Sequence, residues 1–259
     1  MLRALHTAAS GMVAQQVNMD AISHNLANVN TTGFKKGRAE FQDLLYTRIQ
    51  PPVRTQPIGI VIGQGVRLSS LHRDFTGGSM ETTGSDFDVA ISGGGFFPVQ
   101  RGDGTLAYTR DGAFHLDAQR RLATAGGDLL MGAQGPITVP AEAEQLSIGT
   151  DGTISYDSTD KGTVVAGRIQ LAVFTNPAGL ESLGDNLWGA TGASGGATLL
   201  GAGEKEAGRL VQGYLEGSNV QAVEEMVSLI KAQRAYEINS KVVQSADEMM
   251  ALTNNLRRG

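Results

Sequence analysis

Residues 218–256 read SNVQAVEEMVSLIKAQRAYEINSKVVQSADEMMALTNNL, and this stretch decides the fold. Apolar side chains recur in it at steps of three or four residues, or at about twice that spacing. They are Val220, Val223, Val227, Ile230, Ile238, Val242, Met249, Leu252 and Leu256. Such spacing is typical of an amphipathic helix that packs along another helix. The segment therefore predicts a long C-terminal helix with one apolar seam.

Residues 2–26 carry a second seam of the same kind. Its members are Leu2, Leu5, Met12, Met19 and Leu26. For either seam alone, the plain interpretation is one wall of a hydrophobic core. Two seams at opposite ends of the chain favour a shared layer in which the helices pack antiparallel on each other. Val13, Val17, Met226 and Leu229 would then form second faces for neighbouring copies.

Polar residues mark the ends of both helices. Asn28, Asn30 and Thr31 compete for backbone hydrogen bonds, so the first helix is expected to end near residues 27–30. Ser218 and Gln221 have the S-x-x-Q spacing of a capping box, which predicts that the last helix begins there.

The middle of the chain has the pattern of β-structure. From residue 75, short apolar alternations are separated by turn sequences such as RGDG at 101–104 and DG at 151–152. The Gly- and Ala-rich stretch 189–208 lacks this alternation and is expected to be a surface loop. The glycine count, 35 of 259 residues, agrees with many tight turns.

Residues 31–74 are expected to form an extended arm or long hairpin. Pro51, Pro52 and Pro57 favour extended backbone, while Ile58, Ile60 and Ile62 alternate as in a strand. The predicted class is α+β: residues 1–30 and 218–259 form a discontinuous helical coiled-coil layer, residues 31–74 the arm, and residues 75–217 a mainly β outer domain.

Charge is unevenly distributed along the chain. Residues 1–74 contain 8 Lys and Arg against 4 Asp and Glu, whereas residues 75–217 contain 8 against 17. An acidic middle disfavours nucleic acid as a partner. The first residues include Arg3 but no continuous apolar run, so a cleavable secretory signal is not expected.

The sequence offers little for catalysis, metal binding or cofactors. Gly93–Gly95 lacks the Gly-Lys-Ser/Thr ending and the following helix of a phosphate-binding loop. The aspartates lie at strand corners without EF-hand spacing, and the four histidines do not form a zinc motif. There is no cysteine and no G-x-S-x-G element. We therefore expect a protein without cofactor that is not an enzyme. If the terminal helices do not serve assembly, the alternative is a secreted β-domain adhesin or enzyme with helical ends.

Several motifs resemble the flagellar axial proteins, which form the rod, the hook and the hook–filament junction. These motifs are AASGM (8–12), NLANVNTTGFKK (25–36), DVAISGGGFF (88–97), DGTLAYTRDGAF (103–114), FTNPAGLE (174–181) and residues 211–248. Within that family, EGSNV, EEMV and the AQRAYE segment are closer to distal-rod members than to hook or proximal-rod members. A proximal rod or hook-type protein is the alternative.

The resemblance implies a building block of the flagellar distal rod, a helical tube that transmits torque and encloses the export channel. It implies self-assembly, with proximal rod proteins, the hook protein and the P- and L-ring proteins as neighbours. It also implies passage through the type III export apparatus, without a cleaved signal peptide, to the basal body in the periplasmic space. Residues 46–66 correspond to the part of the arm that is thought to stiffen the rod.

Overall fold

The computed structural model describes residues 2–50, 60–140, 143, 145–158 and 162–258. The chain forms two compact units. Unit 1 contains Met1–Ala27, Gly37–Asp74 and Gln221–Gly259, and unit 2 contains Asn28–Lys36 and Phe75–Val220. The segment predicted as one arm, residues 31–74, is thus divided between the units: residues 31–36 lie in unit 2 and residues 37–74 in unit 1.

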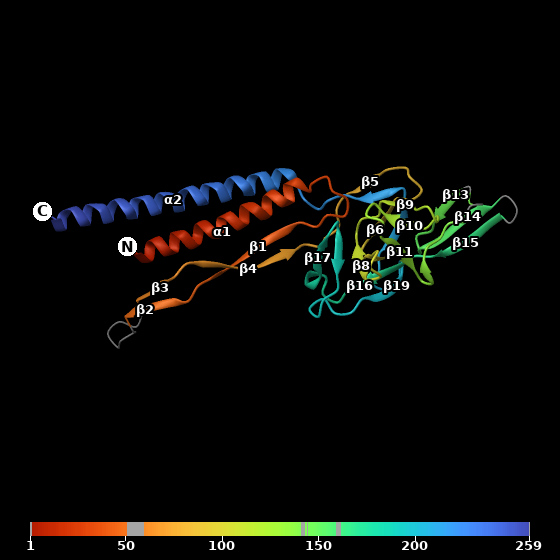
Figure 1. Cartoon of the computed structure of the whole chain (residues 1–259), viewed down its shortest axis with the longest axis horizontal. Coiled ribbons are helices and arrows are strands. Elements are labelled where there is room, and N and C mark those ends of the chain that lie inside the picture. Colours follow the sequence, from red (N-terminus) through yellow and green to blue (C-terminus); the bar gives the residue numbers. More distant parts are fainter. Residues whose placement is uncertain (1, 51–59, 141–142, 144, 159–161, 259) are drawn as a thin grey trace. The chain divides into compact units, whose positions relative to one another are not determined.

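Unit 1 contains both α-helices of the described residues. They are α1 (Leu2–Ala27) and α2 (Ala222–Arg258). Asn25 of α1 bonds to Glu225 near the start of α2, and Gly11 faces Asn239 further along it. The helices therefore lie side by side and antiparallel, as predicted (Figure 1). None of the described helices is long and apolar enough to span a membrane.

A hairpin completes unit 1. Strand β1 (Gly37–Asp43) pairs antiparallel with β4 (Val66–Arg73), and β2 (Tyr46–Gln50) pairs with β3 (Ile60–Gly63). β1 and β4 also pack on α1. A two-stranded ribbon is marginal in water by itself, so the helix supplies the face that it needs.

Unit 2 is built from antiparallel β-strands. An eight-stranded sheet has the order β17-β18-β8-β7-β11-β10-β9, with β12 on β11; β13, β14 and β15 form a second sheet, and β16–β19, β20–β6 and β21–β5 are pairs. The strands are β5 (Met80–Thr82), β6 (Val89–Ser92), β7 (Phe97–Gln100), β8 (Leu106–Thr109), β9 (Phe114–Leu116), β10 (Leu122–Thr124), β11 (Leu129–Gly132), β12 (Gly135–Pro136), β13 (Gln145–Ile148), β14 (Thr153–Ser158), β15 (Gly162–Arg168), β16 (Gln170–Val173), β17 (Glu181–Gly184), β18 (Leu187–Gly189), β19 (Thr198–Gly201), β20 (Arg209–Gln212) and β21 (Tyr214–Glu216); the short 3-10 helix η1 is Pro177–Gly179.

The turn predictions for this unit are confirmed. Residues 101–104 connect β7 to β8, with Arg101 N–H bonded to Thr105 O at 2.9 Å. Residues 149–152 connect β13 to β14, and Gly152 has φ +85°, a conformation that glycine adopts without strain.

Two local predictions are wrong. The stretch 189–208 contains β19, which pairs with β16 along its whole length. The capping box fails as well, because α2 begins at Ala222 and its first helical bond runs from Glu225 N–H to Gln221 O. Ser218 Oγ instead accepts from Val220 N–H in the turn before the helix. Spacing alone could not show that residues 218–220 are held by unit 2.

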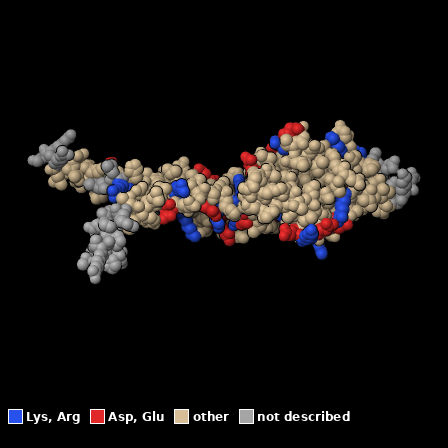
Figure 2. Space-filling model, turned by 90° about the horizontal axis from the view of Figure 1, so that it is seen from below, with Lys and Arg blue, Asp and Glu red and all other residues tan. Residues whose placement is uncertain are grey.

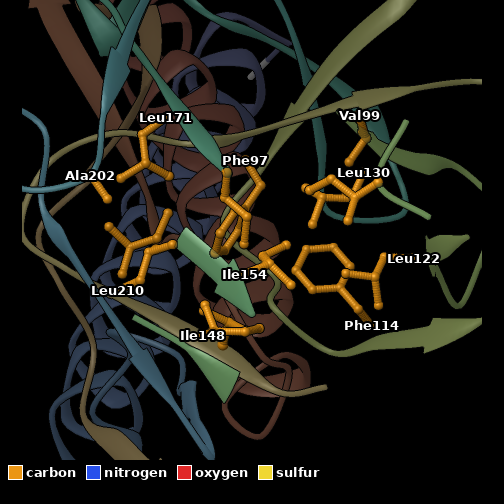
Figure 3. Close-up of a cluster of buried hydrophobic side chains, with 14 of the residues drawn as sticks. Phe97, Val99, Phe114, Leu122, Leu130, Ile148, Ile154, Leu171, Ala202 and Leu210 are labelled. Carbon is orange, nitrogen blue, oxygen red and sulfur yellow. The ribbon is translucent and has the colours of Figure 1, made fainter. Parts of the chain in front are cut away.

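The main core of unit 2 is a continuous apolar cluster that joins the sheets. Figure 3 shows Phe97 and Ile154 near the middle of this cluster, with the ring of Phe114 beside Ile154. Phe97 and Phe114 pack edge to face with ring centroids 5.2 Å apart. A second cluster surrounds Trp188, whose ring centroid lies 4.9 Å from that of Phe75. Unit 2 thus has its own core, which is what an independently folding domain requires.

We predict that Leu130→Ala lowers the free energy of unfolding of unit 2 by about 2–5 kcal/mol, because it leaves a cavity in a fully buried site. Leu106→Ala is the matched control, since Leu106 is 53% exposed. Trp188, the single tryptophan, reports unfolding of this unit by fluorescence. Equal losses for the two variants would contradict the described core.

Candidate functional site

The predicted seam of α2 points away from α1. Val223 is 74% exposed, Ile238 63% and Leu252 64%; Val227, Ile230, Val242 and Met249 are also exposed in the single chain, as is Leu256 at the end of the helix. Val220, the first predicted member, precedes α2 and is buried. Met226, placed on a second face by the sequence argument, is exposed too. The seam is therefore real, but it does not cover the partner helix of the same chain. We call the seven seam residues from Val223 to Leu252 the outward stripe.

Different residues of α2 face the interior of unit 1. Ala232 and Ala246 are each 2% exposed, and Glu225 is 9% exposed. Asn239 lies against Gly11 of α1, where an added Cβ would stand 3.0 Å from the Asn239 amide nitrogen. At these positions small and amide side chains permit a close approach of the two helices. The large apolar residues of the outward stripe are left exposed.

On α1, the predicted seam residues are partly covered. Leu5, Met12, Met19 and Leu26 have intermediate exposure. The backbone of Leu2 belongs to α1, but its side chain lies outside the described residues. The fully buried positions of this helix are Ala8, Ala14, Ile22 and Asn25, and Val13 is 63% exposed.

The arm residues are only partly described. Pro51, Pro52, Pro57 and Ile58 lie outside the described residues, as does the side chain of Ile60. Ile62 of β3 is 43% exposed and lines a cavity of about 450 Å³ with Leu44 and the first turns of α1. The hairpin thus presents apolar side chains that its own unit leaves uncovered.

A buried ionic cluster joins the two terminal motifs inside unit 2. Glu216 ends β21, and its carboxylate accepts from Lys35 Nζ at 2.6 Å and from Arg110 Nη1 at 3.1 Å. All three side chains are at most 4% exposed. Lys35 also donates to Thr76 O at 2.7 Å, and Arg110 to Gly93 O at 2.8 Å. Burial lowers the pKa of the Arg110 guanidinium, and the Glu216 charge opposes that shift.

Backbone bonds reinforce this cluster. Gly33 N–H donates to Glu216 O at 2.7 Å, and Lys36 N–H donates to the Asn219 side chain at 2.8 Å. Gly33 has φ +66°, and an added Cβ would lie 2.6 Å from Asp111 N. NTTGFKK and EGSNV are recognisable as motifs in the sequence, but nothing in their residues indicates that they bind each other.

The described residues offer no metal centre. Within the described ranges, no group of three or more His, Asp or Glu side chains is placed to hold a metal ion. Gly93 and Gly95 have φ +121° and +113°, and their missing side chains make room for Gly208 and Leu171. The glycine run thus serves close packing of the β-structure.

Three protein-family models match parts of this chain. They are "Flagella basal body rod protein" over residues 5–35, "Flagellar hook protein FlgE/F/G D1 domain" over 90–156 and "Flagellar basal body rod FlgEFG protein C-terminal" over 211–256. A flagellar basal-body rod protein FlgG of Borreliella burgdorferi is 46% identical, with 100% of both chains covered. This chain belongs to the flagellar basal-body rod family.

Two further relatives refine the placement within the rod family. A FlgG protein of Caulobacter vibrioides is 45% identical, covering 99% of this chain and 100% of its own. A basal-body rod protein FlgF of the same organism is 35% identical, covering 95% and 94%. Identity to these FlgG chains is higher than to this FlgF chain. The first and last matched models contain Lys35 and Glu216, so the buried cluster joins two rod-family segments.

We predict that Glu216→Gln lowers the free energy of unfolding of unit 2 by about 3–5 kcal/mol, because it leaves two buried cations without their carboxylate. Glu204→Gln is the control: Glu204 pairs with Arg168 at the surface, where loss of a pair costs about 0–1 kcal/mol. Urea unfolding followed by Trp188 fluorescence measures both. A small effect at Glu216 would mean that the cluster contributes little to folding.

Proposed function

We propose that this chain is a structural subunit of the flagellar distal rod, which assembles with copies of itself into a rigid helical tube. Its membership of the basal-body rod family and its higher identity to the FlgG chains support the placement. The observation that carries self-assembly is the outward stripe of α2, which α1 does not cover.

The energetics of the outward stripe favour association. Burying one Val, Leu, Ile or Met side chain contributes about 1.5–3 kcal/mol relative to leaving it exposed. Single exposed apolar residues are normal on a protein surface, but seven of them along one helix form a continuous exposed stripe, which is typical of an interaction site. If the stripe meets a different surface of the next copy, and the rotation between copies does not close a ring, the contact generates an open helical polymer.

In this proposal the α1–α2 pairs form the inner coiled-coil layer around an export channel, and unit 2 forms the outer part. Subunits reach the periplasmic section of the basal body through the type III export apparatus, without a cleaved signal peptide. The adjoining components are the proximal rod proteins, the hook protein and the P- and L-ring proteins as a bushing. The rod transmits torque from motor to hook.

Surface charge fits a shaft that turns inside a bushing. Residues 75–217 carry a formal net charge of −9. Figure 2 shows acidic and basic side chains in small mixed groups on the face of unit 2 in view, with uncharged surface between them. Weak net repulsion without a strong binding patch would limit adhesion to a surrounding ring. A proximal rod or hook-type role is the alternative, and the similarity to the FlgF protein is consistent with it.

We predict that Ile238→Asp prevents polymerisation and leaves the monomer folded. A carboxylate in the outward stripe would have to be buried at the contact between copies, whereas in the monomer it stays in water. Gln244→Asp is the control, because Gln244 is an exposed polar residue on the same helix. Sedimentation and electron microscopy measure assembly, and circular dichroism checks the fold. Normal polymers of Ile238→Asp would exclude the stripe as the contact.

We also predict that deleting residues 46–66 yields polymers that bend more easily. The three prolines restrict the arm before assembly, so less conformational entropy is lost when it packs on a neighbour. Persistence length, measured by electron microscopy, is the readout. Straight and stiff polymers after the deletion would refute the stiffening role, and absence of polymers would make the arm an assembly contact instead.

A further inference from the structure

One buried amide joins three elements of unit 1. Asn25, which is 2% exposed, donates from Nδ2 to Gly37 O at 2.9 Å and to Glu225 Oε2 at 3.2 Å. Its Oδ1 accepts from Gly37 N–H at 2.9 Å. The side chain therefore pairs with the first residue of β1 as a neighbouring strand would, and it also holds the start of α2.

The rest of the helix contact repeats every seven residues. Gly11 lies opposite Asn239 and Asn25 opposite Glu225, and each helix has two heptads between its two positions. On α2 the intervening and following heptad positions are Ala232 and Ala246, both buried. If α2 moved by one heptad, Gly11 would meet an alanine instead of Asn239. Side-chain volume alone therefore discriminates weakly between the two registers.

The polar contact does discriminate. A shift that brings Ala246 opposite Gly11 would place Asn25 against Ala232 and Glu225 beyond the end of α1, where its carboxylate loses the Asn25 amide. A buried carboxylate without a partner is costly, so this register is disfavoured. The opposite shift also breaks the Asn25–Glu225 bond, but it would bring Asn18 opposite Glu225. Polar residues within apolar helix seams fix register in the same way in coiled coils.

We propose that Asn25 and Glu225 are positioning residues that set the register of α1 against α2. A shift of seven residues displaces a helix by about 10 Å along its axis. The outward stripe would then move by the same distance relative to α1. Under the proposed rod function, this register is what lets successive copies meet the stripe at the same height.

Disulfide crosslinking tests the register directly, because the chain has no cysteine of its own. Gly11→Cys is combined with Asn239→Cys for the observed register and with Ala232→Cys or Ala246→Cys for the shifted ones. Each pair is made in the full chain with the natural Asn25 and Glu225, and again with Asn25→Ala and Glu225→Ala. Peptide mass spectrometry of dilute, oxidised monomer gives the initial rate for each pair.

With Asn25 and Glu225 present, the 11–239 pair should link at least about tenfold faster than the 11–246 pair, the register that leaves Glu225 without an amide. With both replaced by alanine, which favours helix, the preference should fall to within about threefold. Glu225→Gln should retain the preference, because its amide oxygen still accepts from Asn25. Gln16→Ala with Glu224→Ala, two exposed positions on the same helices, should leave it unchanged.

Retention of the tenfold preference without Asn25 and Glu225 would overturn the proposal, because the connections of the helices to unit 2 would then set the register. Asn25→Gln is a second variant: it keeps an amide and a helix-forming residue but moves the amide away from Gly37, and it should lose the preference as well. Crosslinking is read in the monomer. A failed rod function would therefore leave this result intact, and a failed register would leave self-assembly open to its own test.

Discussion

A single buried carboxylate constrains how the two ends of this chain enter the fold. Glu216 pairs with Lys35 and Arg110, and its own backbone carbonyl accepts from Gly33. Desolvating three charges is costly, and their attraction compensates only when the geometry is complete. Lys35 follows α1 by a few residues, and Glu216 precedes α2 by a few. Folding of unit 2 therefore brings the end of NTTGFKK next to the start of EGSNV.

The type and order of the elements could be predicted from the sequence, but the faces that they use could not. Three- and four-residue spacing correctly identified both helices, and turn residues identified the β7–β8 and β13–β14 hairpins. Periodicity shows that a helix has an apolar face, yet it does not say which molecule covers that face. The prediction took the large residues for the contact within the chain. That contact instead uses Ala232, Ala246 and Gly11, residues without a strong hydropathy signal.

The missed features have a common physical origin, which is long-range polar pairing. The buried cluster connects Glu216 with Arg110, which is 106 residues away in the sequence, and with Lys35, which is 181 residues away. A lysine within NTTGFKK reads as an exposed charge until its partners are placed around it. Likewise, the Ser218–Gln221 spacing matched a capping box, but Asn219 is held by Lys36 and Thr76, so the helix starts later. Local rules fail here because distant hydrogen bonds compete with them.

The division of labour between the two faces of α2 suits a subunit that has to remain separate before it assembles. The described α2 positions that face the interior include Ala232, Ala246 and Asn239, so the large side chains of the outward stripe add no apolar burial within the single chain. In the proposed assembly, the large side chains on the opposite face contribute only when another copy covers them. That part of the free energy would then depend on concentration and on neighbours. Under this proposal, the subunit gains the stabilisation of the outward stripe only within the polymer.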